Sequence, residues 1–323
     1  MPSPSTTLAL PRYDLGQAQE RFDLAMQKRG YIAQRVLPIF NTAVVADSYP
    51  VIPLDQLLAT AQGDGGKRAS GAGYGRSSFT FTTASYACQE YGWEEPVDDR
   101  QARIYGGLFN AEMVATARCI EKILNYAEQR AVAALHTTAG MAGTAAANVA
   151  WTSYNTAQPL TDFATARDAI WNATGEWPNA IVMSRKKFND LRECAQIIDR
   201  IKNNANYPVL RGEINEAMLA VAFDVDQVIV SGTAKNSAKE GQTASIASTW
   251  TDGNVLVAKL ATSSDLQEIA LGRTFHYSAD GSQPLGYVET YRDETIRADI
   301  VRVRHDVQEK IEYAKCAYLI TSA

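Results

Sequence analysis

Residues 174–193 read TGEWPNAIVMSRKKFNDLRE, the end of a helix followed by a strand and the start of a second helix. Gly175 is a residue type that commonly ends a helix in the left-handed conformation, so a helix is predicted over 161–174. The apolar run over 179–184 predicts a buried strand. Ser184 can accept a hydrogen bond from the first turn of the helix that follows. The stretch therefore predicts a mixed α/β region.

The same alternation continues toward the C-terminus. A further helix is predicted over 215–223, and strands are predicted near 226–231 and 254–260. These elements indicate a small sheet with helices on its faces. The end of the chain alternates apolar and polar side chains over 286–291 and 296–304, which is the period of a strand.

A long helix is predicted before this region, over 99–136. Asp98 or Asp99 can cap its N-terminus, and Glu94 and Glu95 place more negative charge near that positive end. The apolar positions of one face recur every three or four residues, as in an amphipathic helix. They are Met113, Ala117, Ile120, Leu124, Ala127, Ala131 and Leu135, and a bend is expected at Gly106 and Gly107.

The N-terminal part of the chain indicates an arm and a projecting hairpin. Residues 1–60 hold six of the 11 prolines, and a short helix over 15–29 is their one predicted regular element. Residues 61–77 contain six glycines, which indicates a flexible loop, and residues 78–86 then partly alternate like a strand. A hairpin with no domain around it is not stable alone in water, so we expect it to rest on a partner.

Charge and composition exclude several classes of protein. The 323 residues carry 31 Lys and Arg against 36 Asp and Glu, a net charge of −5. This excludes a generally basic nucleic-acid binder, whose affinity comes from neutralising phosphates, but not a protein that merely encloses nucleic acid. No stretch approaches the ~20 apolar residues of a membrane-spanning helix. Four widely spaced cysteines and an N-terminus without a secretory pattern favour free thiols and synthesis in the cytoplasm.

No residue pattern typical of catalysis is found. His136, His276 and His305 lie in no metal-ligand spacing, and the chain has no nucleophile elbow. Lys67 is not followed by the Ser or Thr of a phosphate-binding loop, and a strand pattern comes after it instead of a helix. Cys194 is expected to be a small buried residue on a helix. We therefore predict no catalytic residue, no cofactor and no metal ion.

Several stretches carry a family resemblance. Residues 174–193 end a helix in glycine, pass through a Pro-Asn strand and enter a helix with a Leu-Arg end. Together with 240–250 (EGQTASIASTW), 291–304 and 317–320, they resemble in their order the major capsid proteins of tailed bacteriophages. The resemblance implies an α+β, Hong Kong 97-like fold with an N-terminal arm, an extended β-hairpin loop, a long spine helix, a peripheral domain and an axial domain.

The resemblance also implies a division of the chain. Its five segments are an N-terminal arm (1–60), an extended loop (61–96), a peripheral domain with the spine helix (97–160), an axial domain (161–285) and return strands of the peripheral domain (286–323). Because few residues precede the loop and they show no long coiled-coil pattern, a separate scaffolding protein is expected.

The function implied by the resemblance is structural. Such a protein assembles with itself as hexamers and pentamers into an icosahedral shell, and it encloses double-stranded DNA without binding it tightly. Expected partners are a scaffolding protein, a portal and decoration proteins, with no membrane. The expected location is the virion, after assembly in the host cytoplasm. Two alternatives stay open: an encapsulin-like shell that loads proteins, and a soluble α/β enzyme.

Contacts between subunits are expected at two charged clusters. A basic loop tip from one copy is predicted to lie across the acidic start of the long helix in the next. The alternative is that both clusters are solvated and the acids merely cap the helix. The residues are Lys67, Arg68 and Arg76 at the tip and Glu94, Glu95, Asp98 and Asp99 at the helix start.

Overall fold

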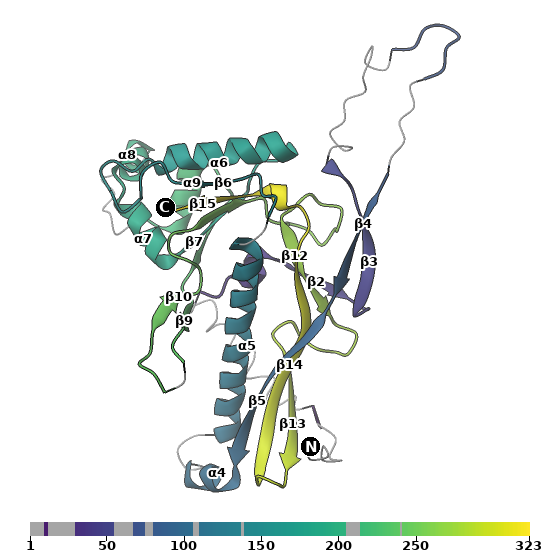
Figure 1. Cartoon of the computed structure of the whole chain (residues 1–323), viewed down its shortest axis with the longest axis vertical. Coiled ribbons are helices and arrows are strands. Elements are labelled where there is room, and N and C mark those ends of the chain that lie inside the picture. Colours follow the sequence, from purple (N-terminus) through teal and green to yellow (C-terminus); the bar gives the residue numbers. More distant parts are fainter. Residues whose placement is uncertain are drawn as a thin grey trace.

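The computed structural model describes residues 10–11, 30–54, 67–74, 80–105, 110–136, 139–204, 214–239 and 241–323. Two β-sheets carry the fold, and the long helix α5 (Ala111–His136) joins them (Figure 1). The five-stranded sheet lies beneath helices at one end of the molecule, and the six-stranded sheet runs beside α5 toward the other. Within the described residues, no helix is both long and apolar enough to cross a membrane.

The five-stranded sheet has the order β6-β15-β11-β7-β8. Its strand β7 is the apolar run predicted from the sequence, and all five of its residues are buried. Such a run fits a strand that is covered on both faces. The strands are β6 (Gly143–Ala146), β7 (Ala180–Ser184), β8 (Gln227–Ser231), β11 (Val255–Ala258) and β15 (Ala317–Thr321).

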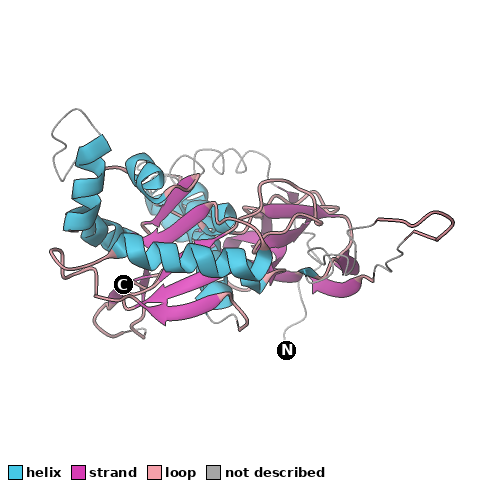
Figure 2. Cartoon of the chain, turned by 90° about the horizontal axis from the view of Figure 1, so that it is seen from above, coloured by secondary structure: helices cyan, strands magenta, loops and turns pink. Residues whose placement is uncertain are grey.

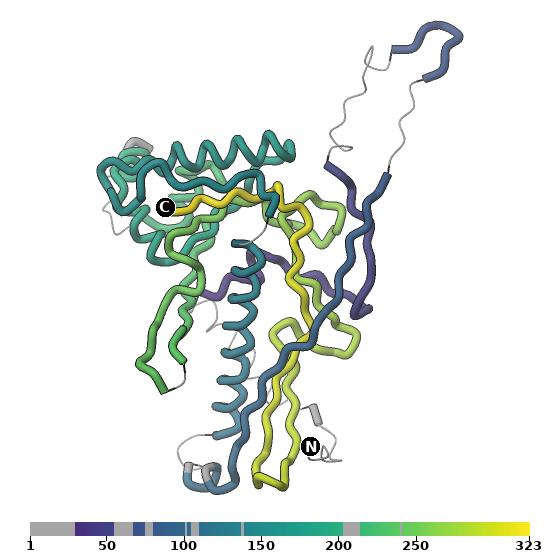
Figure 3. Tube along the Cα trace, viewed as in Figure 1, coloured from purple at the N-terminus to yellow at the C-terminus, as the bar shows by residue number. Residues whose placement is uncertain are grey.

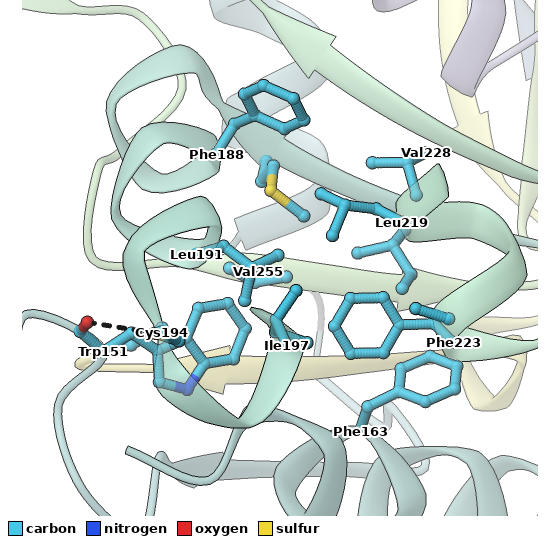
Figure 4. Close-up of a cluster of buried hydrophobic side chains, with 14 of the residues drawn as sticks. Trp151, Phe163, Phe188, Leu191, Cys194, Ile197, Leu219, Phe223, Val228 and Val255 are labelled. Atoms are coloured by element: carbon cyan, nitrogen blue, oxygen red, sulfur yellow. Dashed lines mark hydrogen bonds between the residues drawn. The ribbon is translucent and has the colours of Figure 1, made fainter. Parts of the chain in front are cut away.

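Helices cover one face of this sheet and form the larger hydrophobic core (Figure 2). Phe163 and Phe223, from two different helices, meet edge to face with ring centroids 5.1 Å apart, in the same cluster as Val228 and Val255 (Figure 4). The predicted helix end at Gly175 is confirmed, since this residue has a φ of 74°. The helices are α6 (Pro159–Thr174), α7 (Arg185–Glu193), α8 (Ala195–Asn204) and α9 (Glu216–Phe223).

The opposite face of the five-stranded sheet packs against the C-terminal half of α5. Val182 and Leu256 point to this side and share a buried cluster with Ala131 and Leu135 of α5. The short helix α2 (Ala33–Val36) completes the layer. Because side chains alternate between the two faces of a strand, the same apolar strands serve both cores.

The six-stranded sheet packs on the N-terminal half of α5. Ile120 and Leu124 of the helix lie in one cluster with Val301 and Val303 of β14. Strand β14 continues well past the predicted end at residue 304, because it pairs with β5, β12 and β13 along its length. The strands are β1 (Leu10–Pro11), β2 (Ile39–Thr42), β5 (Gln89–Asp98), β12 (Gly272–Tyr277), β13 (Tyr287–Asp293) and β14 (Ala298–Ile311).

Two hairpins project from this body. The extended hairpin pairs β3 (Ala46–Val51) with β4 (Thr82–Ala87), and residues 67–74 lie far beyond it at its tip (Figure 3). A shorter hairpin pairs β9 (Ala234–Asn236) with β10 (Ile246–Ser248). The partner of β4 therefore comes from the segment that the resemblance assigns to the N-terminal arm.

The single helix predicted over 99–136 is wrong. Helix α4 (Asp99–Tyr105) and α5 are separate, and the predicted bend residues 106 and 107 lie outside the described part of the chain. The physical reason is a new N-cap: the Asn110 side chain accepts hydrogen bonds from the backbone N–H groups of Glu112 at 3.0 Å and Met113 at 3.3 Å.

The strands of each sheet come from more parts of the chain than the five segments implied by the resemblance. Strand β15, near the C-terminus, pairs with β11 and β6 in the five-stranded sheet, whereas β13 and β14 belong to the six-stranded sheet. Strand β12, which lies within 161–285, pairs with β14. These crossings tie the two sheets into one unit.

Candidate functional site

The histidines occupy structural positions. His276 and His305 are 0% and 3% exposed, and the Nδ1 of His305 donates to the carbonyl of Pro284 at 3.0 Å. Burial lowers the pKa of His305 to about 4, and it lowers the pKa of His276 and His136 as well. In the part of the chain that the structure describes, no group of His, Cys, Asp or Glu side chains is placed to hold a metal ion.

The cysteines are also structural. All four are free and buried. Burial raises the pKa of each thiol, that of Cys194 to about 11, so none is held as a thiolate near neutral pH. The sulfur of Cys194 lies 3.5 Å from the carbonyl oxygen of Trp151, inside the larger core (Figure 4). The predicted burial of Cys194 is confirmed, but its predicted place on a helix is wrong, because Cys194 is the extended residue between α7 and α8.

The base of the extended hairpin is fixed by aromatic packing. Tyr86 of β4 stacks on Phe275 of β12 with centroids 4.5 Å apart and planes 6° from parallel. Tyr49 of β3 packs against the same ring at 5.4 Å. Phe275 is 0% exposed. The hairpin is thus anchored to the six-stranded sheet by its base alone within the described residues.

A buried ion pair lies beside this anchor. Arg273 and Glu312 are each 1% exposed at the side chain, and Arg273 Nη1 lies 2.7 Å from Glu312 Oε2. Burial raises the pKa of Tyr49, and the nearby carboxylate of Glu312 raises it further. The Tyr313 hydroxyl donates to the carbonyl of Ile52 at 3.1 Å, just past β3. The ion pair and the hydrogen bond therefore fix the orientation of the hairpin where it leaves the six-stranded sheet.

The hairpin tip is exposed and basic. Lys67 and Arg68 lie on it, and the Arg68 guanidinium stands 4.9 Å from the centroid of the Tyr74 ring. The Tyr74 side chain is 70% exposed. Arg76 falls outside the described residues.

The predicted acidic cluster is divided between a strand and a helix start. Glu94 and Glu95 lie on β5, not on the helix, and they point to opposite faces of the sheet. Glu94 pairs with Arg302 of β14 and accepts from the Tyr291 hydroxyl at 3.1 Å. Glu95 pairs with Arg118 of α5 at 2.6 Å.

The two aspartates lie at the start of α4. The Asp98 side chain accepts from the Arg100 backbone N–H at 2.8 Å, so the predicted capping is confirmed. Asp99 binds the guanidinium of Arg292 through both oxygens, at 2.6 and 2.7 Å, and these hydrogen bonds lower its pKa. All four acids thus have partners in the same chain. None of these partners is one of the tip residues that the structure describes.

No protein-family model and no curated protein matches the chain. Solved structures do match it. A phage-related protein from Bordetella bronchiseptica RB50 is 19% identical with a TM-score of 0.69, and the match covers 98% of each chain. A prophage capsid protein of Escherichia coli CFT073 is 12% identical with a TM-score of 0.58, and the match covers 98% of this chain and 100% of that one.

An encapsulin from Synechococcus elongatus PCC 7942 is 12% identical with a TM-score of 0.52, over 91% of this chain and 87% of its own. This score is lower than those of the two phage-derived structures. The chain has the fold of phage capsid proteins. The fold expected from the sequence resemblance is confirmed.

The phage capsid fold of this chain contains one feature that the sequence patterns did not predict. Three alternate residues of β5 meet basic residues of α5: Glu95 pairs with Arg118, and Lys122 Nζ lies 4.3 Å from the Trp93 centroid. The Arg130 guanidinium lies 3.9 Å from the centroid of Tyr91. From Glu95 to Trp93 the strand rises about 6.6 Å, and from Arg118 to Lys122 the helix rises about 6 Å, so these two spacings match. Arg130 lies two further helical steps of four residues beyond Lys122. The signal was the spacing of the basic side chains at 118, 122 and 130 on α5, which are four and eight residues apart.

Proposed function

We propose that this chain is the major capsid protein of a tailed bacteriophage, a structural protein that assembles as hexamers and pentamers into an icosahedral shell around double-stranded DNA. The observation that carries the proposal is the extended hairpin on a phage capsid fold. Its base is packed on Phe275, while its tip lies far from the body and exposes Tyr74. A two-stranded ribbon of this kind is stabilised by a neighbouring surface.

The charge of the chain supports a wall that encloses DNA. At a net charge of −5, the protein has no overall attraction for phosphates that would hold the genome against the shell. Further expected partners are a separate scaffolding protein, a portal and decoration proteins. Assembly is expected in the host cytoplasm, and the finished protein resides in the virion.

Contact between subunits is proposed through the extended hairpin. Its tip residues Lys67, Arg68 and Arg76 would approach carboxylates of the neighbouring copy. The acids proposed from the sequence as the receiving side are Glu94, Glu95, Asp98 and Asp99. Each of these carboxylates has an in-chain partner, so a basic tip would add to an existing pair or exchange with it.

Sizing and electron microscopy of the purified chain test the proposal. We expect megadalton particles with icosahedral symmetry when the chain is expressed with its scaffolding protein. Nucleic acid extracted from particles made during infection distinguishes a capsid from an encapsulin-like shell, because the latter would enclose protein cargo instead. A chain that stays strictly monomeric under all these conditions would contradict the proposal and would favour the alternative, a soluble α/β enzyme.

A further inference from the structure

Strand β5 runs along an open edge of the six-stranded sheet, beside α5 (Figure 1). It pairs with β14 from residue 89 to residue 98, and within the described residues no second strand pairs with it. The far side of β14 is already occupied by β13 and β12. An exposed strand edge offers N–H and C=O groups to which an extended peptide can add as a new strand.

The register identifies the backbone groups of β5 that point outward. The Asp99 N–H donates to the carbonyl of Arg297, just before β14, at 3.3 Å. Hydrogen-bonded and non-hydrogen-bonded residues alternate in an antiparallel pair, so the even-numbered residues of β5 point their N–H and C=O groups away from β14. Between residues 90 and 96 these are Glu90, Gly92, Glu94 and Pro96. The open edge ends at the proline, because proline has no N–H.

Strand β3 fills the same edge beside the preceding residues of the chain. The N–H of Cys88, which is also even-numbered, donates to the carbonyl of Val45 at 2.8 Å, next to the β3–β4 ladder. Residues 43–45 bend away between β2 and β3, so β3 does not continue along β5. A strand added beside Glu90 and Gly92 would continue the line of β3.

The charges on the sheet face away from α5 favour a basic occupant. Glu90 is exposed and lies directly opposite Asp306 of β14, and like charges in this position destabilise a sheet. The Oδ1 atom of Asp306 is buried without a hydrogen-bond partner, and burial and the carboxylate of Glu90 raise the pKa of Asp306. Arg304 is engaged with Asp280 and Glu289. A lysine or arginine beside Glu90 would relieve the repulsion.

The face toward α5 favours apolar or aromatic side chains instead. Tyr126 of α5 is 47% exposed, and its ring centroid lies 6.0 Å from that of Trp93 on β5. The positive charge of Lys122 already lies over the Trp93 ring. An added strand alternates its side chains between the two faces. Every second side chain would therefore lie beside these rings, and the intervening ones would lie beside the carboxylates of the other face.

A second copy of the chain is a poor occupant of this edge. The antiparallel register of two β5 edges that uses all three open N–H groups is centred on Gly92, and it places Glu90 of each copy opposite Glu94 of the other. Each other described strand already has a partner in its own copy. We propose that the open edge of β5 binds an extended segment of a different protein, in which basic side chains alternate with apolar ones. The site needs one copy only, so the inference does not depend on the proposed function.

Binding of a short fluorescent peptide of alternating lysine and valine to the purified full-length chain tests the inference. Fluorescence anisotropy measures the affinity, and a peptide of alternating glutamate and valine is expected not to bind. Glu90→Lys is expected to weaken binding of the lysine–valine peptide about tenfold, because a cross-strand attraction becomes a repulsion. The matched control Glu176→Lys reverses an exposed acid outside β5 and should keep the parent affinity.

A second pair of variants separates strand addition from simple charge attraction. Glu90→Gln and Glu90→Pro both remove the charge, but only proline also removes the outward N–H. Because this N–H points away from β14, both variants keep the β5–β14 ladder, which circular dichroism and thermal unfolding check. Glu90→Pro is expected to bind the lysine–valine peptide about fivefold more weakly than Glu90→Gln, the effect of one hydrogen bond. Equal affinities of the two variants would overturn strand addition.

Two other outcomes would assign the edge to a second copy of the chain. A peptide of residues 67–74 that binds as tightly as the lysine–valine peptide, and whose binding Glu90→Pro weakens, would identify the extended hairpin as the occupant. Dimers of the parent chain that Glu90→Pro abolishes would show that two β5 edges pair with each other. Either result overturns a different protein as the partner. Neither result decides whether shells form, so failure of the inference and failure of the proposed function are distinct.

Discussion

The indole nitrogen of Trp250 lies 2.5 Å from the Oε2 atom of Glu128, a carboxylate that is 1% exposed in the middle of α5. Its other oxygen accepts from the backbone N–H groups of Ile32 at 2.5 Å and Ala33 at 2.6 Å. One side chain thus joins the long helix, the N-terminal segment and the loop before β11. Burial raises the pKa of Glu128, and the three N–H donors oppose that rise.

Replacing Glu128 with Gln is expected to lower the free energy of unfolding by about 2–4 kcal/mol, because the new NH₂ group must face an N–H donor in a buried site. Urea unfolding followed by tryptophan fluorescence measures this. The second change Trp250→Phe removes one of those donors, so the double variant is expected to lose less than the sum of the single losses. The control Glu176→Gln, which weakens an exposed pair with Lys259 at 3.9 Å, is expected to change stability by less than about 1 kcal/mol. Full additivity would contradict the proposed clash.

Acid is expected to destabilise the protein through its buried histidines. The pKa of His305 is about 4 in the folded chain against 6.5 for the free side chain, so the unfolded chain binds more protons between these values. Stability therefore falls as pH drops from 6.5 toward 4, by about 1.4 kcal/mol per pH unit for this group. Arg130, which lies 3.5 Å from the ring, adds repulsion to a protonated His305, and Glu309 pairs with that arginine at 3.0 Å.

Unfolding in urea at pH 7, 6 and 5 measures this dependence. The variant His305→Gln is expected to flatten the slope even if it lowers stability at pH 7. The exposed control Lys315→Gln does not titrate in this range and should keep the slope of the parent chain. A parent chain whose stability is constant from pH 7 to 5 would rule out the effect.

Local patterns predicted much of the five-stranded sheet. Gly175 and Ser184 mark their helix ends as expected, and β7 follows from the four apolar residues 180–183 between them. These signals act within a few residues of one another, so they can be read without tertiary contacts.

The partners of the acidic residues could not be predicted in the same way. Glu94 meets Arg302 only because β5 pairs with β14 across 208 positions of sequence. The break between α4 and α5 was missed because the apolar face used for the prediction lies entirely within α5 and does not locate its start, whereas the Asn110 cap that starts α5 is a single residue. The pairing of β15 with the five-stranded sheet was missed for a similar reason. An alternating pattern predicts a strand, but it does not specify which strand it pairs with.

The aromatic base of the extended hairpin is expected to control its stability. Phe275→Ala removes the ring on which Tyr49 and Tyr86 pack, and a loss of about 3–5 kcal/mol is expected for a fully buried phenylalanine. Hydrogen exchange should rise across β3 and β4 more than in the five-stranded sheet. The control Val44→Ala changes a side chain near β3 that is 50% exposed and should leave exchange unchanged. Unchanged protection of β4 in Phe275→Ala would show that the hairpin is held elsewhere.

Charge reversal at the hairpin tip is expected to impair assembly. The variant Lys67→Glu/Arg68→Glu turns two attractions into repulsions, and exposed pairs contribute ~0.2–1 kcal/mol each. The sum corresponds to roughly tenfold weaker association at each contact, and a closed ring repeats it at every subunit. Yield of shells by sedimentation measures the effect. The matched control Lys186→Glu/Lys315→Glu makes the same charge change at exposed positions away from the tip.

Compensating changes identify the receiving surface. Adding Glu94→Lys/Glu95→Lys to the tip variant restores assembly in part if the acidic edge is the acceptor, although it also breaks the in-chain pairs with Arg302 and Arg118. Normal shells from the tip variant alone would show that this pairing is not needed, and that the apolar contacts of the hairpin suffice to orient it.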